Sequence, residues 1–225
     1  MTVGSTVYLG VSVVVASVVS SLYLDREVLR DLPSPTFQPR PLAFSIWSVV
    51  FATGVLRAIL QWIYRNGPDD VQTVSLVLHA TSFLFCAIWA PTFSNGFVRT
   101  ASVVLGVACV LAHLSVVLSN VGLDDWSMVL VHSGADLLAG WLSVAFLLSI
   151  VLASWAPDAT SLLLVGSALV TSIAVLLSRP FMLIPLLWAC LFQHHFDVHV
   201  RWTLVLVCLG LLASSITRDQ IVRHA

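Results

Sequence analysis

Long apolar runs follow one another along this chain, and most are long enough to cross a lipid bilayer as helices. A transmembrane helix needs roughly 20 mainly apolar residues, because its backbone polar groups have to be satisfied within the segment. Hydrophobic residues make up 59% of the 225 residues and charged residues 9%, whereas a soluble domain carries about 25% charged residues. The sequence therefore predicts an all-α, polytopic transmembrane helix bundle in contact with the lipid bilayer.

Eight apolar segments predict seven or eight spans. They cover residues 2–24, 43–64, 71–91, 101–118, 128–155, 161–178, 180–192 and 202–216. The first run has no cation before Arg26, so we expect a retained helix and not a cleaved signal peptide. The last run is short for a full span, and we expect it to tilt or to lie partly in the interface.

Charge and cysteine placement argue against several classes of partner. The ten cations are all arginines and stand singly, so no basic block is available for nucleic acid. The four cysteines lie inside apolar runs without a CxxC pair, which argues against zinc, covalent haem attachment and a disulfide framework. Three histidines and an aspartate fall within residues 193–199, but no glutamate lies between His195 and His199 as it does in zincins. We interpret this segment as a titratable loop at the membrane surface and predict no metal site.

An aromatic stripe marks the second apolar run. Phe44, Trp47 and Phe51 stand at positions i, i+3 and i+7, so their rings share one face of a helix. Pro39 and Pro41 precede them, and because proline does not fit inside a helix, they set where this helix begins. The stripe is typical of a buried packing face, and it also suits the wall of a pocket for a flat ligand.

The third run carries its polar and aromatic side chains on one continuous face. The spacing of 0, 3, 7, 10 and 14 joins His79, Ser82, Cys86, Trp89 and Phe93. A mixed face of this kind suits a cavity wall, with rings for contact and a few polar groups for orientation. Helix–helix packing with His79 bonded to a neighbouring carbonyl explains it equally well.

Asp136 is the carboxylate set well inside an apolar run. An ionisable side chain at membrane depth costs about 2.5–3.5 kcal/mol on insertion scales and normally faces a partner or a cavity. His132 lies one turn away on the same face, which Ser143 continues, and is the first candidate partner. Trp141 points to another side of that helix. Arg57, near the far end of the second run, is expected to extend its side chain to the membrane surface.

Three motifs in order resemble those of the tryptophan-rich sensory protein family, the TspO/translocator-protein group. Phe37, Pro39 and Ala43-Phe44-Ser45-Ile46-Trp47 are similar to the second-helix signature of its longer branch, F-x-P-A-G-x-x-F-S-I-W. Trp89-Ala90-Pro91 with Phe93 and Gly96 resembles the family's W-S-P-x-F-F-G motif of helix three. Gly140-Trp141 with Ser143 and Ala145 resembles the family's G/A-W-x-x-A motif of helix five. The resemblance implies a five-helix core over residues 1–155. The tail with Pro185 and Trp188 resembles the longer branch's extension, so residues 156–225 are expected to form a C-terminal extension with two or three further segments.

Three positions depart from the family pattern. Cys86 stands where an asparagine is usual, residues 134–138 replace a Pro-Tyr element, and Ser149 replaces a second asparagine. These positions resemble ones that line or shape the family's ligand pocket. The resemblance therefore supports inheritance of the fold more strongly than inheritance of the ligand.

The resemblance implies a pocket for a tetrapyrrole, such as protoporphyrin or haem, or for a sterol. We place this pocket between helices two, three and five; the predicted contacts are Phe44, Trp47, Phe51, His79, Cys86, Trp89, His132 and Asp136. No cofactor is assigned beyond a porphyrin or haem as ligand, and a homodimer or a larger membrane complex is compatible with the sequence.

Three functions from different classes follow. The first is a receptor or carrier for a flat hydrophobic ligand, favoured by the aromatic stripes. The second is a non-catalytic structural or accessory subunit of a membrane complex, favoured by the departures at pocket positions. The third is a porphyrin-modifying enzyme, which is disfavoured because the sequence offers no nucleophile–base pair; no catalytic residue is predicted.

Overall fold

The computed structural model describes residues 3–23, 45–63, 70–119, 126–153, 179–192 and 209. In chain order its elements are α1 (Val3–Tyr23), α3 (Ile46–Ile63), α4 (Asp70–Ser94), α5 (Val98–Leu118), α6 (Trp126–Leu152), the short 3-10 helix η2 (Pro180–Met182) and α8 (Leu183–Phe192). These elements are all helical, which confirms the predicted fold class.

Five helices, α1, α3, α4, α5 and α6, are long and apolar enough to cross a membrane. They match the first five predicted runs. The predicted segment 161–178, the histidine-bearing loop 193–199 and nearly all of 202–216 lie outside the described residues. The total of seven or eight spans and the division at residue 155 therefore stay predictions.

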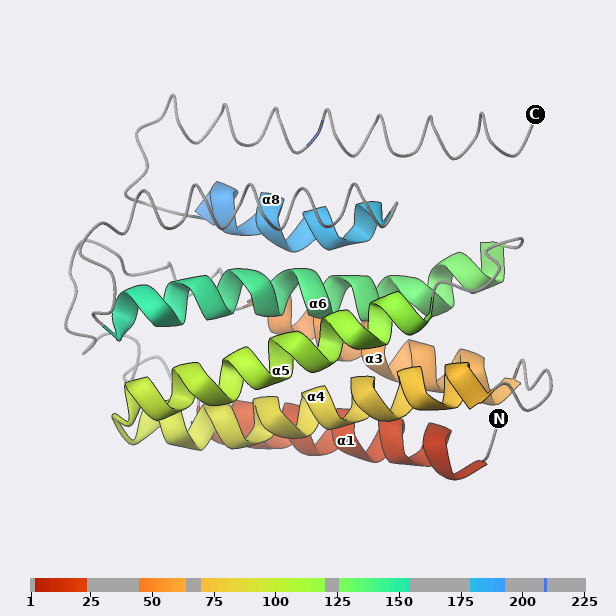
Figure 1. Cartoon of the computed structure of the whole chain (residues 1–225), viewed down its shortest axis with the longest axis horizontal. Helices are drawn as coiled ribbons and strands as arrows, with labels where there is room; N and C mark the ends of the chain where they lie inside the picture. Colours follow the sequence, from red (N-terminus) through yellow and green to blue (C-terminus); the bar gives the residue numbers. More distant parts are fainter. Residues whose placement is uncertain are drawn as a thin grey trace.

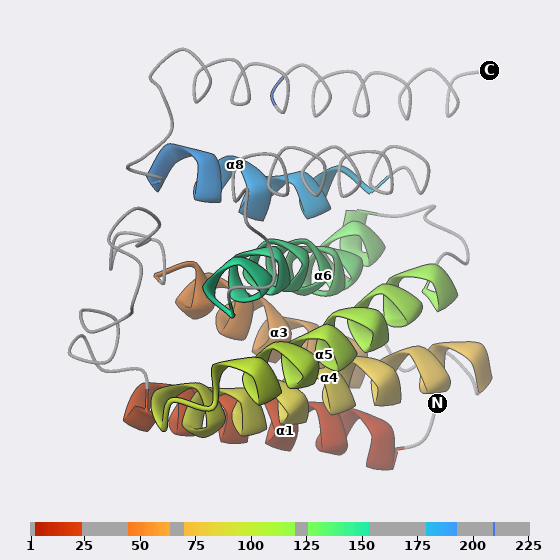
Figure 2. The same ribbon diagram turned by 60° about the vertical axis from the view of Figure 1, so that its left-hand side comes forward.

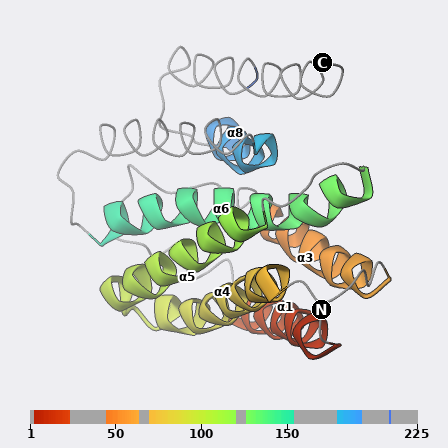
Figure 3. The same cartoon turned by 45° about the vertical axis from the view of Figure 1, so that its right-hand side comes forward.

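The five long helices lie side by side as a bundle (Figure 1). Helix α4 packs between α1 and α5, α6 packs against α5 and α3, and α3 also packs against α1. Helix α8 and η2 lie against α6. In the turned views α8, in blue, stays on the side of α6 away from α1 (Figures 2 and 3). Helix α6 is thus the element that joins the bundle to η2 and α8.

The turn between α4 and α5 shows why both helices end where they do. Helix α4 continues one turn beyond the predicted end at Pro91 and stops at Ser94. Gly96 follows with φ +82°, a conformation that glycine adopts without steric penalty. Its amide donates to the Phe93 carbonyl at 3.0 Å, and the Phe97 amide donates to the Thr92 carbonyl at 3.1 Å. The last carbonyls of α4 are satisfied in this way before α5 begins.

Two glycines let α6 approach its neighbours at backbone distance. A Cβ atom at Gly134 would lie 2.9 Å from the carbonyl oxygen of Thr53 on α3. A Cβ atom at Gly140 would overlap the carbonyl oxygen of Met182 in η2. Small residues at helix interfaces are the usual means of close packing in a membrane, where the hydrophobic effect does not drive helices together.

Gly140→Ala is expected to destabilise the protein, because the added methyl group meets backbone that cannot rotate away. Overpacking of this kind costs about 1–3 kcal/mol. Thermal unfolding of the purified protein in mild detergent measures the effect.

Gly10→Ala on α1 is the matched control. Its Cβ would meet the Ala58 Cβ at 4.0 Å, an ordinary contact. Since alanine is favoured over glycine in a helix by roughly 0.5–1 kcal/mol, this variant is expected to be neutral or slightly stabilised. Equal stability of the two variants would contradict the close α6–η2 contact.

Candidate functional site

Trp47 is the centre of an aromatic cluster that connects three helices. Its ring stacks on Phe51 with centroids 5.4 Å apart and on Trp89 of α4 at 6.1 Å. Trp141 of α6 meets it edge-on at 5.9 Å. The series extends from Trp89 to Phe93 at 5.3 Å. The aromatic faces predicted for the second and third helices therefore do converge, in the interior of the bundle.

These rings pack directly against one another between α3, α4 and α6. Trp47, Trp89 and Trp141 are all buried. Stacked and edge-to-face pairs at these separations are favourable arrangements for aromatic side chains. The contacts observed here are side chain to side chain, so a ligand pocket between these three helices stays a prediction.

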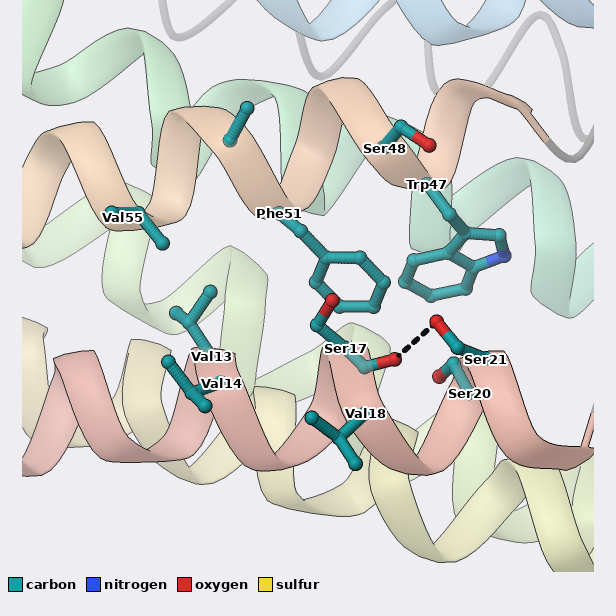
Figure 4. Close-up of a pocket in the computed structure, with 11 residues that line it drawn as sticks. Val13, Val14, Ser17, Val18, Ser20, Ser21, Trp47, Ser48, Phe51 and Val55 are labelled. Carbon is teal, nitrogen blue, oxygen red and sulfur yellow. Dashed lines mark hydrogen bonds between the residues drawn. The ribbon is translucent and has the colours of Figure 1, made fainter.

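A groove of about 520 Å³ lies on the other side of Trp47 and Phe51, between α1 and α3. Figure 4 shows both rings pointing from α3 towards α1. The lining consists of Val13, Val14, Ser17, Val18, Ser20 and Ser21 from α1 with Trp47, Ser48, Phe51, Ala52 and Val55 from α3. A second groove of about 480 Å³ shares Val14 and Val55 with it and continues along the same two helices as far as Trp62. Volumes of about 300–1,000 Å³ are typical of small-molecule sites.

Polar atoms gather at one end of the groove, where α1 finishes and α3 begins. The Ser21 hydroxyl donates to the Ser17 carbonyl at 2.8 Å. The buried Oγ of Ser20 and Nε1 of Trp47 have no hydrogen-bond partner in the part of the chain that the structure describes. The groove is therefore mostly apolar, and two unpartnered polar atoms are buried in its wall at this end.

A second group of functional side chains lies deeper in the bundle and is charged. Asp136 on α6 is 1% exposed and Arg179, immediately before η2, is 2% exposed. Arg179 Nη1 lies 3.9 Å from Asp136 Oδ1. Arg57 on α3, 1% exposed, interacts electrostatically with both. Three charged side chains from three segments of the chain thus lie together in an apolar interior. We call the group formed by Arg57, Asp136, Arg179, His79 and His132 the buried ionic cluster.

Two sequence-based expectations about this cluster need correction. The carboxylate of Asp136 does face the bundle interior, but its ion-pair partner is Arg179, which lies 43 residues away. Both ring nitrogens of His132 lack a hydrogen-bond partner among the described residues. Arg57 does not extend to the membrane surface; it is buried, and its Nη2 donates to the Ser75 hydroxyl of α4 at 3.4 Å.

His79 is the member of the buried ionic cluster that lies on α4, and its side chain is buried. Its ring meets Phe83 edge-on at 5.1 Å, and Phe83 meets Phe51 at 5.9 Å. Neither ring nitrogen of His79 has a hydrogen-bond partner in the described ranges. The carbonyl bond expected as one explanation of His79 is therefore not made there, and the ring links the aromatic cluster to the buried ionic cluster.

Serine hydroxyls join α4 to α5 around Arg57. Ser75 Oγ donates to the Ser115 carbonyl at 2.8 Å, and Ser115 Oγ donates to the Ser75 carbonyl at 2.8 Å. About two helical turns further along α4, Ser82 Oγ donates to the Ala108 carbonyl at 2.8 Å. These three bonds satisfy polar groups inside the bundle and hold α4 and α5 in register.

Cys109, His113 and Ser143 form a separate polar contact between α5 and α6. His113 Nδ1 lies 2.8 Å from the Cys109 carbonyl, and His113 Nε2 lies 3.3 Å from Ser143 Oγ. Ser143 Oγ donates to the Ala139 carbonyl at 2.9 Å, so its proton is already engaged. The Ser143 hydroxyl therefore lies between the Ala139 carbonyl and the His113 ring, and it contributes to the contact between α5 and α6.

The predicted contact residues therefore divide between two places. Trp47 and Phe51, although 5% and 9% exposed, line the α1–α3 groove. Five other predicted contacts do not line it and are buried; they are His79, Cys86, Trp89, His132 and Asp136. Phe44 lies outside the described residues. Sequence reasoning missed Trp141, Arg179 and the serines of α1 as site residues. The Gly140-Trp141 motif was a signal for the first, but the other two depend on which helices become neighbours.

Comparison with known protein families relates the chain to one of them. The family model described as TSPO-like protein matches residues 5–217. No curated protein and no solved structure matches the chain.

Asp136→Asn is expected to destabilise the protein strongly, because it leaves Arg179 and Arg57 without the carboxylate that both of them face. Breaking a buried ion pair typically costs about 3–5 kcal/mol. Thermal unfolding in detergent at low salt measures the loss. Asp70→Asn, at the exposed first residue of α4, is the control and is expected to change stability by less than about 1 kcal/mol; similar losses in both variants would contradict the role of the ion pair.

Proposed function

Since the chain belongs to the TSPO-like protein family and is an integral, multi-pass membrane protein, we propose that it binds a flat apolar ligand, as a receptor or carrier. The ligand lies in the groove between α1 and α3, against Trp47 and Phe51. This groove is next to the pocket predicted from the sequence and shares these two residues with it.

The observation that carries the proposal is the stacked pair of Trp47 and Phe51 on the groove wall. The two ring planes are 23° from parallel, and both rings point from α3 into the groove towards α1 (Figure 4). Trp47 is backed by Trp89 and Trp141, which prevents it from turning away. A rigid aromatic wall of this kind favours a flat, rigid ligand over a flexible acyl chain, because both partners lose little conformational freedom on contact.

A tetrapyrrole or a sterol is the ligand class that fits. Both have a flat apolar body with polar groups at the edge, and the groove is lined at one end by Ser17, Ser20 and Ser21 of α1. A hydroxyl or carboxyl group of the ligand lies against these serines. The valines of the other end contact the apolar body.

The alternative function, a structural or accessory subunit of a larger membrane complex, is supported by a different observation. The Trp47 ring contacts both Trp89 and Trp141 where the sequence predicts an open pocket. A bundle whose interior is closed in this way is also suited to serve as a scaffold for neighbouring subunits.

Titration of the purified protein with protoporphyrin, and separately with a sterol in competition, tests the proposal through tryptophan fluorescence. Stacking of one ring on an aromatic side chain contributes about 1–3 kcal/mol, so Trp47→Ala is expected to weaken binding by about tenfold or more. Because this variant also removes core contacts, Ser17→Phe provides an independent measurement: it fills the groove from α1 and is expected to weaken binding to a similar extent.

Val11→Phe is the matched control, since Val11 is exposed on α1 and does not line the groove. It is expected to bind like the wild type. Saturable binding that is unchanged in both Trp47→Ala and Ser17→Phe would place the site elsewhere. Absence of binding together with co-purifying subunits would favour the accessory-subunit function.

A further inference from the structure

Arg57 carries hydrogen-bond donors that the surrounding protein leaves unsatisfied. Its guanidinium is buried between α3, α4 and α6, and Nη2 donates to Ser75 Oγ at 3.4 Å. Nε and Nη1 have no acceptor among the described residues. An arginine side chain remains protonated in proteins, so these are donors of a permanent cation in an apolar interior. Such groups are costly unless an acceptor is present.

The charged side chains next to Arg57 do not balance one another. Asp136 Oδ1 lies 3.9 Å from Arg179 Nη1, beyond hydrogen-bond distance, and has no hydrogen-bond partner among the described residues, so a single carboxylate faces two guanidinium groups. His79 and His132 lie close enough to Arg57 to interact electrostatically with it, and none of their ring nitrogens has a hydrogen-bond partner in the described part of the chain. Each neutral imidazole contributes one N–H donor in addition to one acceptor. Among the residues that the structure describes, the charged groups around Arg57 are thus two guanidinium groups and one carboxylate, which together carry a net positive charge.

We propose that Arg57 is the centre of an anion-binding site within the membrane span. One monovalent anion accepts hydrogen bonds from the unsatisfied N–H groups of Arg57, and the N–H groups of His79 and His132 complete its surroundings. Asp136 then remains the counter-ion of Arg179, and each of the two guanidinium groups has a negative partner.

Two sources supply this chemistry. One is a small free anion such as chloride. The other is the acidic head of an apolar molecule that enters from the bilayer, such as a fatty acid. Chloride and a carboxylate head group each carry one negative charge and accept hydrogen bonds. Hydrogen bonds between a charged donor and a charged acceptor are stronger than those between neutral groups.

The anion site is separate from the groove proposed for the flat ligand. Arg57 does not appear among the residues that line the groove, although Val55 and Ala58 on either side of it in sequence line one or both parts. Trp47→Ala is therefore expected to weaken binding of the flat ligand and to leave anion binding unchanged. Failure of either proposal leaves the other standing.

Thermal unfolding of the purified full-length protein tests the anion site. The background is sodium sulfate at constant ionic strength, and the probes are chloride, laurate and uncharged methyl laurate. A ligand that binds only the folded protein raises the midpoint temperature in a saturable manner. A saturable rise with chloride supports a free ion, and a rise with laurate but not with methyl laurate supports an acidic head group. No rise with either anion overturns the proposal.

Variants of the cluster locate the effect. Arg57→Gln is expected to abolish the saturable rise and Arg57→Lys to retain it with lower affinity, whereas Arg99→Gln, at an exposed arginine of α5, leaves it unchanged. Asp136→Asn removes the competing carboxylate and is expected to tighten anion binding by about tenfold, the effect that one nearby charge commonly has.

An equal anion effect in wild type and Arg57→Gln would overturn the assignment to Arg57. If Arg57→Gln does not fold, the comparison of Arg57→Lys, which keeps the positive charge, with wild type decides. Unchanged anion affinity in Arg57→Lys would then contradict the proposal.

Discussion

The ion pair between Asp136 and Arg179 is the contact on which the arrangement of this bundle depends. It lies in a low-dielectric interior, where a charge without a partner is far more costly than the same charge at a surface. Because Asp136 belongs to α6 and Arg179 begins the segment that leads into α8, the pair fixes these two parts of the chain against each other. Arg57 brings α3 to the same point.

The packing around this pair follows from residues near Asp136 on α6. Gly134, two residues before it, admits the backbone of α3, and Gly140, four residues after it, admits the backbone of η2. Trp141 then meets Trp47 edge-on. A single helix therefore positions an ion pair, two close backbone contacts and an aromatic contact within two turns. The side chains that approach Asp136 are held by backbone packing and not only by their charges.

Much of the fold was predictable because membrane helices are specified locally. Length and apolarity of the runs predicted five helices that the structure describes, with ends shifted by a few residues, as at Pro91, where α4 continues for one more turn. The interior position of Asp136 was also predictable, since a carboxylate in an apolar run has few alternatives.

The partners of these residues were not predictable in the same way. Nothing local distinguishes Arg179 from His132 as the partner of Asp136, because that choice depends on which segment lies against α6. Arg57 was expected at the membrane surface, because arginine near the end of a membrane helix usually extends its side chain there. The Asp136 carboxylate and the Ser75 hydroxyl instead stabilise the Arg57 side chain inside the bundle. The groove requires the pairing of α1 with α3, which no motif in either helix encodes.

Helix α3 connects the two proposed sites, because it contributes to both from different sides. Trp47, Phe51 and Val55 face the groove, while Arg57 reaches into the buried ionic cluster. The same Trp47 ring that lines the groove is stacked on Trp89 and touches Trp141 with its other side. Trp47 is therefore held in place by α4 and α6 as well as by its own helix. Because the interior is close-packed, the position of the groove wall is set by the same aromatic contacts that join α3 to the rest of the bundle.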